Sequence, residues 1–261
     1  MIALAQLVAD LERLCPLGAA ETWDNVGLLL DPREDEHRVS TVLLTVDLTA
    51  PVLDEALEAG ADLVIAYHPP IFAPLRRLDR TAPGTRTLLR AIRHGVALWS
   101  PHTALDNIAG GINDWLAGLL GDAVRCTPIQ PREDPRVGAG RLVELAEAVT
   151  VDEMVARIKA GLGLPSLRVA RGTRPIRTAA VCPGAGGSLF EALDGPDLYL
   201  TGEMRHHDVL AKLARGASVI LTEHTNCERG YLPHLAARLQ ATHPGLAVHV
   251  SQRDADPLAP A

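Results

Sequence analysis

The sequence predicts an α/β fold built on mostly parallel sheets, and three observations lead to that expectation. Short, continuously apolar runs alternate with segments whose apolar residues recur at helical spacing, which is typical of buried parallel strands joined by helices. Three of these runs are followed by a histidine, one directly and two after a single intervening residue. A His-x3-acid motif occurs once in each half of the chain, which hints at two similar α/β units.

The first half of the chain shows the alternation clearly. The apolar stripe that begins at Leu4 stops before Pro16, and Gly60 and Gly121 follow two further helical stripes. In chain order we expect a helix over residues 4–14, a strand over 41–46, a helix over 52–59, a strand over 62–67, a helix over 85–94, a strand over 96–100 and a helix over 112–120.

The stretch Thr127–Arg136 interrupts this pattern. It holds three prolines and four charged residues in ten positions, a composition typical of a linker or a long surface loop. We therefore expect an N-terminal α/β domain over residues 1–126 and a C-terminal α/β domain over residues 127–261, whose final segment can pack back on the first domain. In the second half we expect strands at 142–145, 167–170, 178–181, 198–201, 218–222 and 246–250. We expect helices at 151–158 and 205–215, and a further helix that follows the 218–222 strand and runs through residue 239.

Composition excludes several classes of protein. A formal net charge of −7 and 3% aromatic residues argue against an extended nucleic-acid surface, although they leave room for a single nucleotide in a cleft. The four scattered cysteines form neither a zinc ribbon nor a disulfide framework. The N-terminus is typical of an amphipathic helix rather than a signal peptide, and no apolar run approaches the roughly 20 residues that span a bilayer. We therefore expect a cytoplasmic protein with no membrane partner.

Polar side chains follow several of the predicted strands. They are Asp47, His68, His102, Glu203 and His224. Ligands of open α/β sheets sit outside the carboxyl ends of the strands, so these side chains can converge on one cleft.

The two His-x3-acid motifs extend this set of side chains. Residues four apart share one face of a helix, which places Asp106 with His102 and Glu228 with His224. Imidazole with carboxylate suits zinc, iron, cobalt or manganese better than calcium. The spacing therefore predicts a metal site.

Three neighbouring features leave two interpretations open. His206 and His207 fit either a solvated helix face or a place near the site. The glycine-rich run Gly184–Gly187 fits either a phosphate cradle or a tight strand-to-helix turn, and the turn is the simpler interpretation. Cys227 is either a soft additional ligand or a buried structural cysteine.

Several segments, taken together, are highly specific. They are Glu21–Leu28, His68–Phe72, His102–Asp106, Gly110–Asp114, Thr201–Asp208 and His224-x3-Glu228. In these segments the chain resembles the GTP cyclohydrolase I type 2 homologue family, also called the Nif-three-like family of dinuclear metal proteins. The resemblance extends over essentially the whole chain. It implies two similar α/β domains with a metal site in the cleft between them, and assembly into a ring-like homohexamer.

The resemblance also implies a set of metal ligands. One metal would be held by His68, Asp106 and Glu228, and the second by His224, Glu228 and a histidine directly before His68. Tyr67 occupies that last position here. A neutral phenol is a poor ligand, and its reference pKa of about 10 makes ionisation costly without the field of the metal.

The substitution by Tyr67 bears on the number of metal ions. We expect one or two divalent ions per chain, Zn, Fe, Mn or Co. The second ion would be weak, differently ligated or absent. His102 and Cys227 are the candidates to compensate.

The function implied by the resemblance is metal-dependent hydrolysis of a nucleotide or phosphoester through metal-activated water. Glu203, His206 and His207 would act as acid, base or positioning groups. The alternative is a non-catalytic, oligomeric metal-binding or regulatory protein, which needs the ligands but no substrate pocket. Tyr67 makes this alternative more credible here than for a typical member of the family.

Overall fold

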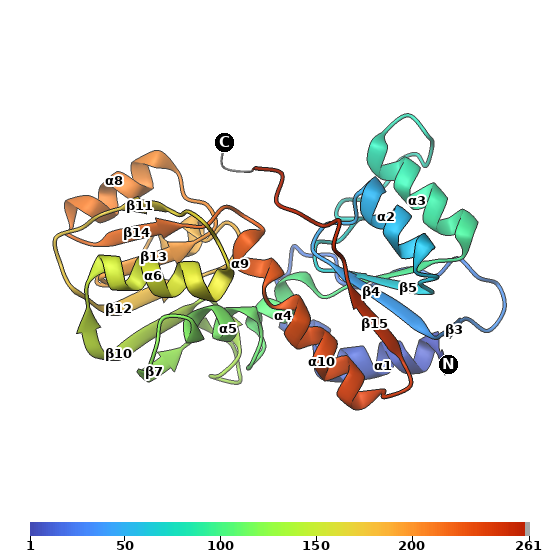
Figure 1. Cartoon of the computed structure of the whole chain (residues 1–261), viewed down its shortest axis with the longest axis horizontal. Coiled ribbons are helices and arrows are strands. Elements are labelled where there is room, and N and C mark those ends of the chain that lie inside the picture. The colour runs from blue at the N-terminus through green and yellow to red at the C-terminus, as the bar shows by residue number, and fades with distance from the viewer. Residues whose placement is uncertain (259–261) are drawn as a thin grey trace. The chain divides into compact units, whose positions relative to one another are not determined.

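The computed structural model describes residues 1–258, and in it the chain forms two compact units (Figure 1). The first unit comprises Met1–Leu105 and Tyr231–Ala255. The second comprises Asp106–Gly230 and the terminal segment that begins at Asp256. Each unit is an α/β layer structure, as the alternating pattern predicts, whereas the division of the chain differs from the expected one at residue 126.

The first unit is built on a five-stranded sheet in the order β15–β4–β5–β6–β2. The first four strands of that order run parallel, and β2 pairs antiparallel with β6 at the edge. A further two-stranded sheet joins β1 and β3. The strands are β1 (Ile2–Ala3), β2 (Gly27–Leu30), β3 (Arg38–Val39), β4 (Thr41–Thr45), β5 (Leu63–Ala66), β6 (Ala97–Ser100) and β15 (Ala247–Val250).

Helices cover both faces of this sheet (Figure 1). On one face, Val52 and Leu53 of α2 and Leu88 of α3 pack against inward side chains of β4, β5 and β6 in one apolar cluster. Leu4, Leu7 and Leu11 of α1 and the leucines of α10 are buried as well. The helices are α1 (Leu4–Leu14), α2 (Ala50–Glu58), α3 (Pro83–His94) and α10 (Leu232–Thr242), with a 3-10 turn at Leu17–Ala19 and the short α4 (His102–Asn107) at the boundary of the two units.

The final segment of the first unit returns to complete its sheet. β15 pairs with β4 in parallel, with Ala247 opposite Thr41. Beyond it, the Glu55 carboxylate accepts hydrogen bonds from the backbone N–H groups of Gln252 and Arg253, and Asp254 Oδ2 accepts one from Val46 N at 2.7 Å. These contacts fix the chain between the last strand and Asp256.

The second unit is built on a six-stranded mixed sheet in the order β11–β14–β13–β12–β10–β7. Its central strands β12, β13 and β14 run parallel, and the outer three pairings are antiparallel. The strands are β7 (Ala123–Thr127), β10 (Arg141–Val149), β11 (Arg168–Ala170), β12 (Ile176–Val181), β13 (Leu198–Thr201) and β14 (Ser218–Leu221). Its helices are α5 (Ile112–Gly118), α6 (Val151–Leu162), α7 (Gly187–Phe190), α8 (His206–Ala214) and α9 (Asn226–Arg229).

The central strands of this sheet bury both faces. Leu198 and Leu200 of β13 join the cluster under α5 and α6, whereas Tyr199 between them joins the cluster that contains Phe190 of α7. Successive side chains of a strand point to opposite faces, so a strand between two helical layers must be apolar throughout. This explains the continuous apolar runs in the sequence.

Local signals set the ends of α6. The Thr150 hydroxyl accepts a hydrogen bond from Glu153 N at 3.2 Å, and the Glu153 carboxylate accepts one from Thr150 N at 2.8 Å. This reciprocal capping box begins the helix. Gly163 ends it in the left-handed conformation, with φ +66°.

The proline-rich stretch Thr127–Arg136 lies inside the second unit and does not form a linker between domains. It contains β8 (Gln130–Pro131), which pairs with β9 (Gly138–Ala139) in a short hairpin. Because β7 pairs with β10 just before the hairpin, the chain is already part of the second sheet at residue 123. Proline is tolerated in such a short two-stranded hairpin because it lies at a sheet edge.

Among residues 1–258, no helix combines the length and the apolar character that crossing a bilayer requires.

Candidate metal centre

In each unit, polar side chains follow the parallel strands at the carboxyl edge of that unit's own sheet. In the first unit Asp47 follows β4, His68 follows β5 and His102 follows β6. In the second unit Glu203 follows β13 and His224 follows β14. This is the edge at which open α/β sheets bind ligands.

His68 is oriented by a carboxylate from the neighbouring strand. Its Nδ1 lies 2.9 Å from Asp47 Oδ1. A carboxylate on Nδ1 favours the tautomer that carries the proton on that nitrogen and leaves the Nε2 lone pair for a metal. The half-buried ring is therefore fixed as a ligand would be.

His102 has the same arrangement, with a partner that is more deeply buried. Its Nδ1 lies 2.7 Å from Asp24 Oδ1, and Thr103 donates to Asp24 Oδ2 through its hydroxyl and, at 3.1 Å, through its backbone N–H. Burial alone would raise the pKa of Asp24, but the hydrogen bonds from His102 and Thr103 outweigh it and hold the pKa below its usual value. Asp24 was not among the expected site residues. In the sequence it was indicated by its position between Trp23 and Asn25, inside the segment Glu21–Leu28 that resembles the family.

Three of the expected ligands of the first unit gather into one cluster. The ring centroids of Tyr67 and His68 lie 5.0 Å apart, and His102 lies 5.5 Å from each of them. Trp23 and Phe72 approach His102 edge-on at 6.1 and 6.2 Å. Tyr67 is only 2% exposed, so its phenol lies in an interior, largely aromatic environment.

Asp106 lies on α4, one helical turn after His102, as the spacing predicts. It is half-buried, and its carbonyl oxygen accepts a hydrogen bond from Asn113 Nδ2 at 3.0 Å. This bond ties the end of α4 to the start of α5.

In the second unit, His224 lies between two carboxylates. Its Nδ1 is 3.2 Å from Glu203 Oε1, and its Nε2 is 3.7 Å from Glu228 Oε1. Glu203 therefore repeats the role of Asp47, and Glu228, only 2% exposed, is placed beside the nitrogen that would bind a metal.

Two glycines, Gly184 and Gly202, lie directly against His224 and Glu228, and we call them the glycine floor. Gly184, at φ +58°, approaches so closely that an added Cβ would lie 2.8 Å from Glu228 Oε1 and 3.1 Å from His224 Nε2. A Cβ on Gly202 would meet His224 Cα at 2.8 Å. The glycine-rich run is thus a tight turn that leaves room beside the donors, and α7, which follows it, is a single turn of helix.

Cys227 is a buried structural thiol. Its Sγ donates to the His224 carbonyl at 3.2 Å and accepts from Gly184 N at 3.3 Å. Burial, with a further contribution from the Glu228 charge, raises the pKa of the thiol to about 12. The thiol therefore helps to shape the loop, which is the simpler of the two interpretations of this residue.

The three residues expected to act as acid or base all lie within residues 203–207. Glu203 contacts His224, as described above. His206 and His207 are exposed in the first turn of α8, with ring centroids 5.5 Å apart. Their role in acid–base chemistry stays a prediction.

Each unit, taken by itself, offers donor atoms that suit a divalent metal. Each unit offers an imidazole whose Nδ1 faces a carboxylate, and the second adds the buried Glu228 under a glycine floor that leaves space at the donor atoms. Nitrogen and carboxylate oxygen donors suit Zn, Fe, Mn or Co.

Comparison with known proteins identifies the family. Residues 2–257 match the model of the family described as Duf34/NIF3 (NGG1p interacting factor 3). The chain belongs to the DUF34/NIF3 family. The resemblance to Nif-three-like proteins is thereby confirmed. The matching names describe family members and do not state a catalytic activity.

Relatives of the DUF34/NIF3 family match along nearly their full length. NIF3-like protein 1 of Drosophila melanogaster is 38% identical over 263 residues, covering 98% of this chain and 88% of that protein. The NIF3 homologue of Schizosaccharomyces pombe is 40% identical over 254 residues, covering 92% and 91%.

Solved structures share the fold of this chain. Staphylococcus aureus protein SA1388 has a TM-score of 0.87 and 25% identity, covering 100% of this chain and 99% of that one. HcgD from Methanocaldococcus jannaschii has a TM-score of 0.83 at 21% identity, covering 96% and 98%, and shows the fold alone. The expected α/β fold with two similar domains is confirmed.

Proposed function

We propose that this DUF34/NIF3 protein is a metal-dependent hydrolase whose divalent ion is held by His68, Asp106, His224 and Glu228. The repeated carboxylate–imidazole pair carries the proposal. Asp47 fixes His68 in one unit and Glu203 fixes His224 in the other, so both rings present Nε2 as a donor.

The residues divide the chemical work as follows. A bound divalent metal lowers the pKa of a coordinated water to about 7 and polarises the bond to be cleaved. Asp106 and Glu228 supply negative charge that balances the ion. Glu203, and His206 and His207 on α8, are the groups proposed to take up or release a proton.

The proposed substrate is a nucleotide or another phosphoester. Beside Glu203, the second unit has a cavity of about 450 Å³, a size that suits a small polar ligand. Arg205 and Ser188 line it and offer donors to phosphate oxygens, while Glu191 and Asp208 add negative charge. Because carboxylates outnumber the guanidinium there, a phosphoester would enter only with metal ions as counter-charge.

Two measurements on the same sample test the proposal. Metal content per chain is determined by elemental mass spectrometry on untagged protein that has not met a chelator. Hydrolysis of GTP and of bis(p-nitrophenyl) phosphate is then followed with and without added Zn, Mn, Co or Fe(II). Metal-dependent turnover supports a hydrolase, whereas a metal-loaded protein without turnover of either substrate contradicts it.

A Glu203→Gln variant separates positioning from acid–base chemistry. If Glu203 orients His224, we expect the metal affinity to fall about 10–100-fold, the usual cost of losing the partner of a ligand histidine. If it mainly transfers protons, metal affinity stays unchanged while kcat falls. Equilibrium competition with a chromophoric chelator and steady-state kinetics distinguish the two outcomes. Glu191→Gln, on the same cavity, is the control.

The second candidate function is a non-catalytic, oligomeric metal-binding protein, with a homohexamer as the proposed assembly. The position and burial of Tyr67 favour it. The phenol replaces the histidine that the family pattern has before His68, and it packs at 5.0 Å against that ring in a buried environment. A site that lost one imidazole is better suited to a single ion than to a pair.

A Tyr67→His variant tests this candidate. We expect one tightly bound ion per chain in the parent and close to two in the variant, because an imidazole replaces a poor ligand. Elemental mass spectrometry measures the ratio, and native mass spectrometry measures the assembly. Tyr67→Phe, which keeps the ring and removes the hydroxyl, should retain the parent ratio. Equal metal content in Tyr67→His and the parent would reject the role assigned to this position.

A further inference from the structure

The terminal segment that begins at Asp256 holds the loop that carries His224 and Glu228. Asp256 Oδ2 accepts hydrogen bonds from the Thr225 hydroxyl at 2.7 Å and from Thr225 N at 3.3 Å. Asp256 Oδ1 accepts one from Leu258 N at 2.9 Å. One oxygen of the carboxylate therefore orders the terminal segment, and the other fixes the loop.

Thr225 makes several hydrogen bonds within that loop. It directly follows His224 and is only 4% exposed. Its carbonyl oxygen accepts from Glu228 N at 3.1 Å and from Arg229 N at 2.9 Å, and its hydroxyl oxygen accepts from Arg229 Nη1 at 2.7 Å. A shift of Thr225 consequently moves both His224 and Glu228.

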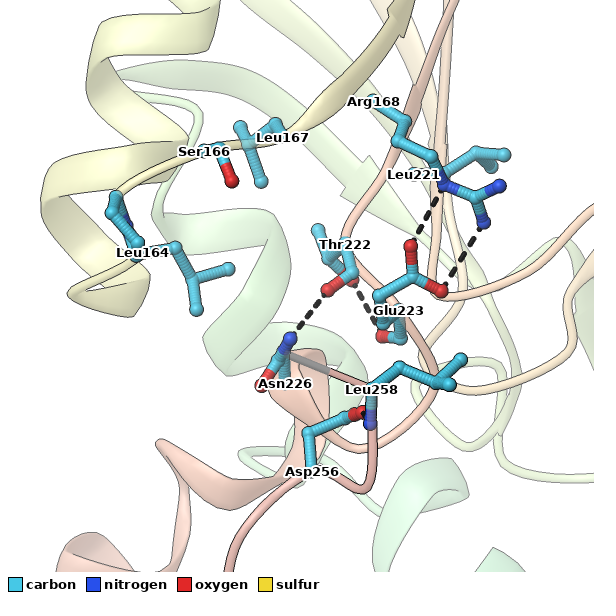
Figure 2. A pocket seen from close by; sticks show the side chains of 11 residues that line it. Leu164, Ser166, Leu167, Arg168, Leu221, Thr222, Glu223, Asn226, Asp256 and Leu258 are labelled. Atoms are coloured by element: carbon cyan, nitrogen blue, oxygen red, sulfur yellow. Dashed lines mark hydrogen bonds and ion pairs between the residues drawn. The ribbon is translucent and has the colours of Figure 1, made fainter. Parts of the chain in front are cut away.

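Packing holds this side of the loop only in part. A cavity of about 400 Å³ lies beside the loop, and Thr222, Asn226, Asp256 and Leu258 are among the residues that line it. Figure 2 shows these side chains, with Asp256 and Leu258 below Thr222. Glu223, which also lines it, has a positive φ of 65°, a conformation that a non-glycine residue keeps only where its surroundings enforce it. The polar contacts across the cavity edge therefore carry much of the fixation.

We propose that Asp256 is a positioning residue of the metal centre, acting through Thr225 on His224 and Glu228. It touches neither the proposed ion nor a substrate. Its effect is to hold the two donors at the separation seen here, 3.7 Å between His224 Nε2 and Glu228 Oε1. This inference rests on the proposed metal centre.

The test uses Co(II) as the probe, because its visible absorption reports the geometry of its ligands. The full-length parent, Asp256→Ala, Asp256→Asn and Thr225→Val are loaded with Co(II), and affinity is measured by chelator competition. We expect Asp256→Ala to bind about tenfold more weakly, at the lower end of the cost of losing an outer partner. Its absorption bands should shift as well.

Two further variants make the test specific. Asp256→Asn keeps an oxygen that can accept both bonds from Thr225, so it should retain the affinity and spectrum of the parent. Thr225→Val should weaken binding in the same direction as Asp256→Ala, and the loss in the double variant should be smaller than the sum of the two single losses, because both single changes remove the hydrogen bond between the Thr225 hydroxyl and the Asp256 carboxylate. Asp152→Ala, at an exposed acid of α6, is the control.

The outcomes separate this inference from the proposed function. A parent that binds no Co(II) overturns the metal centre and the role of Asp256 with it. A parent that binds, together with an Asp256→Ala variant of equal affinity and identical spectrum, overturns only the role of Asp256. A variant that merely unfolds at a lower temperature, with an unchanged spectrum, also overturns it.

Discussion

Replacing Glu228 with glutamine is expected to abolish tight metal binding and, with it, any hydrolytic turnover. Glu228 is 2% exposed, and its Oε1 lies 3.7 Å from His224 Nε2, so the substitution removes a charged donor from the centre of the proposed site. Loss of a ligand should exceed the roughly 10–100-fold that loss of a ligand's partner costs. The metal-free variant should stay folded, because glutamine has nearly the same shape and a neutral group is easier to bury.

Elemental mass spectrometry and chelator competition measure this effect. Glu223→Gln is the matched control, since that carboxylate belongs to the same loop but pairs with Arg168 Nε at 2.7 Å. Breaking this partly exposed pair should cost about 1 kcal/mol of stability and leave metal binding intact. If Glu228→Gln retains the metal content of the parent, His224 and Glu228 are not its ligands.

Replacing Gly184 with alanine is the second change for which we expect a large effect. The added Cβ would lie 2.8 Å from Glu228 Oε1 and 3.1 Å from His224 Nε2. To relieve these close contacts, either the carboxylate and the ring must move away or the loop must shift. The positive φ of 58° adds about 1–2 kcal/mol of backbone strain for any residue with a side chain. We expect reduced stability and a loss of metal affinity of about 100-fold, comparable with loss of a ligand's partner at its upper limit.

Gly163→Ala separates the two causes. Gly163 has nearly the same backbone conformation, φ +66°, but a Cβ there would meet nothing within 4 Å. Gly163→Ala should therefore lose only the free energy of unfolding that the backbone strain costs, Gly184→Ala should lose at least as much in denaturant titrations, and only Gly184→Ala should lose metal. Equal metal affinity of the two variants would show that the glycine floor does not shape the site.

The sequence predicted most of the α/β architecture because its strands are continuous apolar runs and several of its helices end at glycine or proline. The stretch over residues 127–136 was interpreted as a linker or a long surface loop, whereas its residues 130 and 131 pair with 138 and 139 in a short hairpin. Pro131 lies in a short edge pairing, and such a pairing depends on tertiary contacts that single-sequence patterns do not report. Short antiparallel strands such as β2 were missed for the same reason.

Of the candidate site, the ends of the strands were predictable and the partners of the histidines were only partly so. Asp47 and Glu203 stood out because each directly follows a strand or its last glycine. Asp24 and Asp256 did not, since they reach His102 and Thr225 across 78 and 31 residues of sequence. Nothing local marks such a pairing. The close approach of Gly184 was likewise invisible, because a glycine at a turn predicts a bend but not what lies above it.

The glycine floor has a consequence for variation within the family. Gly184 and Gly202 approach the donors through their main chain, and any side chain added there would crowd the donors. Substitution at these two positions is therefore a poor way to change which ligand the site accepts. Differences in the ligands that related proteins bind should instead arise from the residues that line the cavity beside Glu203. There, Glu203, Met204 and Arg205 form an exposed to half-buried segment between β13 and α8 that can change without crowding the donors. Exchanging this segment between relatives should transfer preference while leaving metal affinity in place.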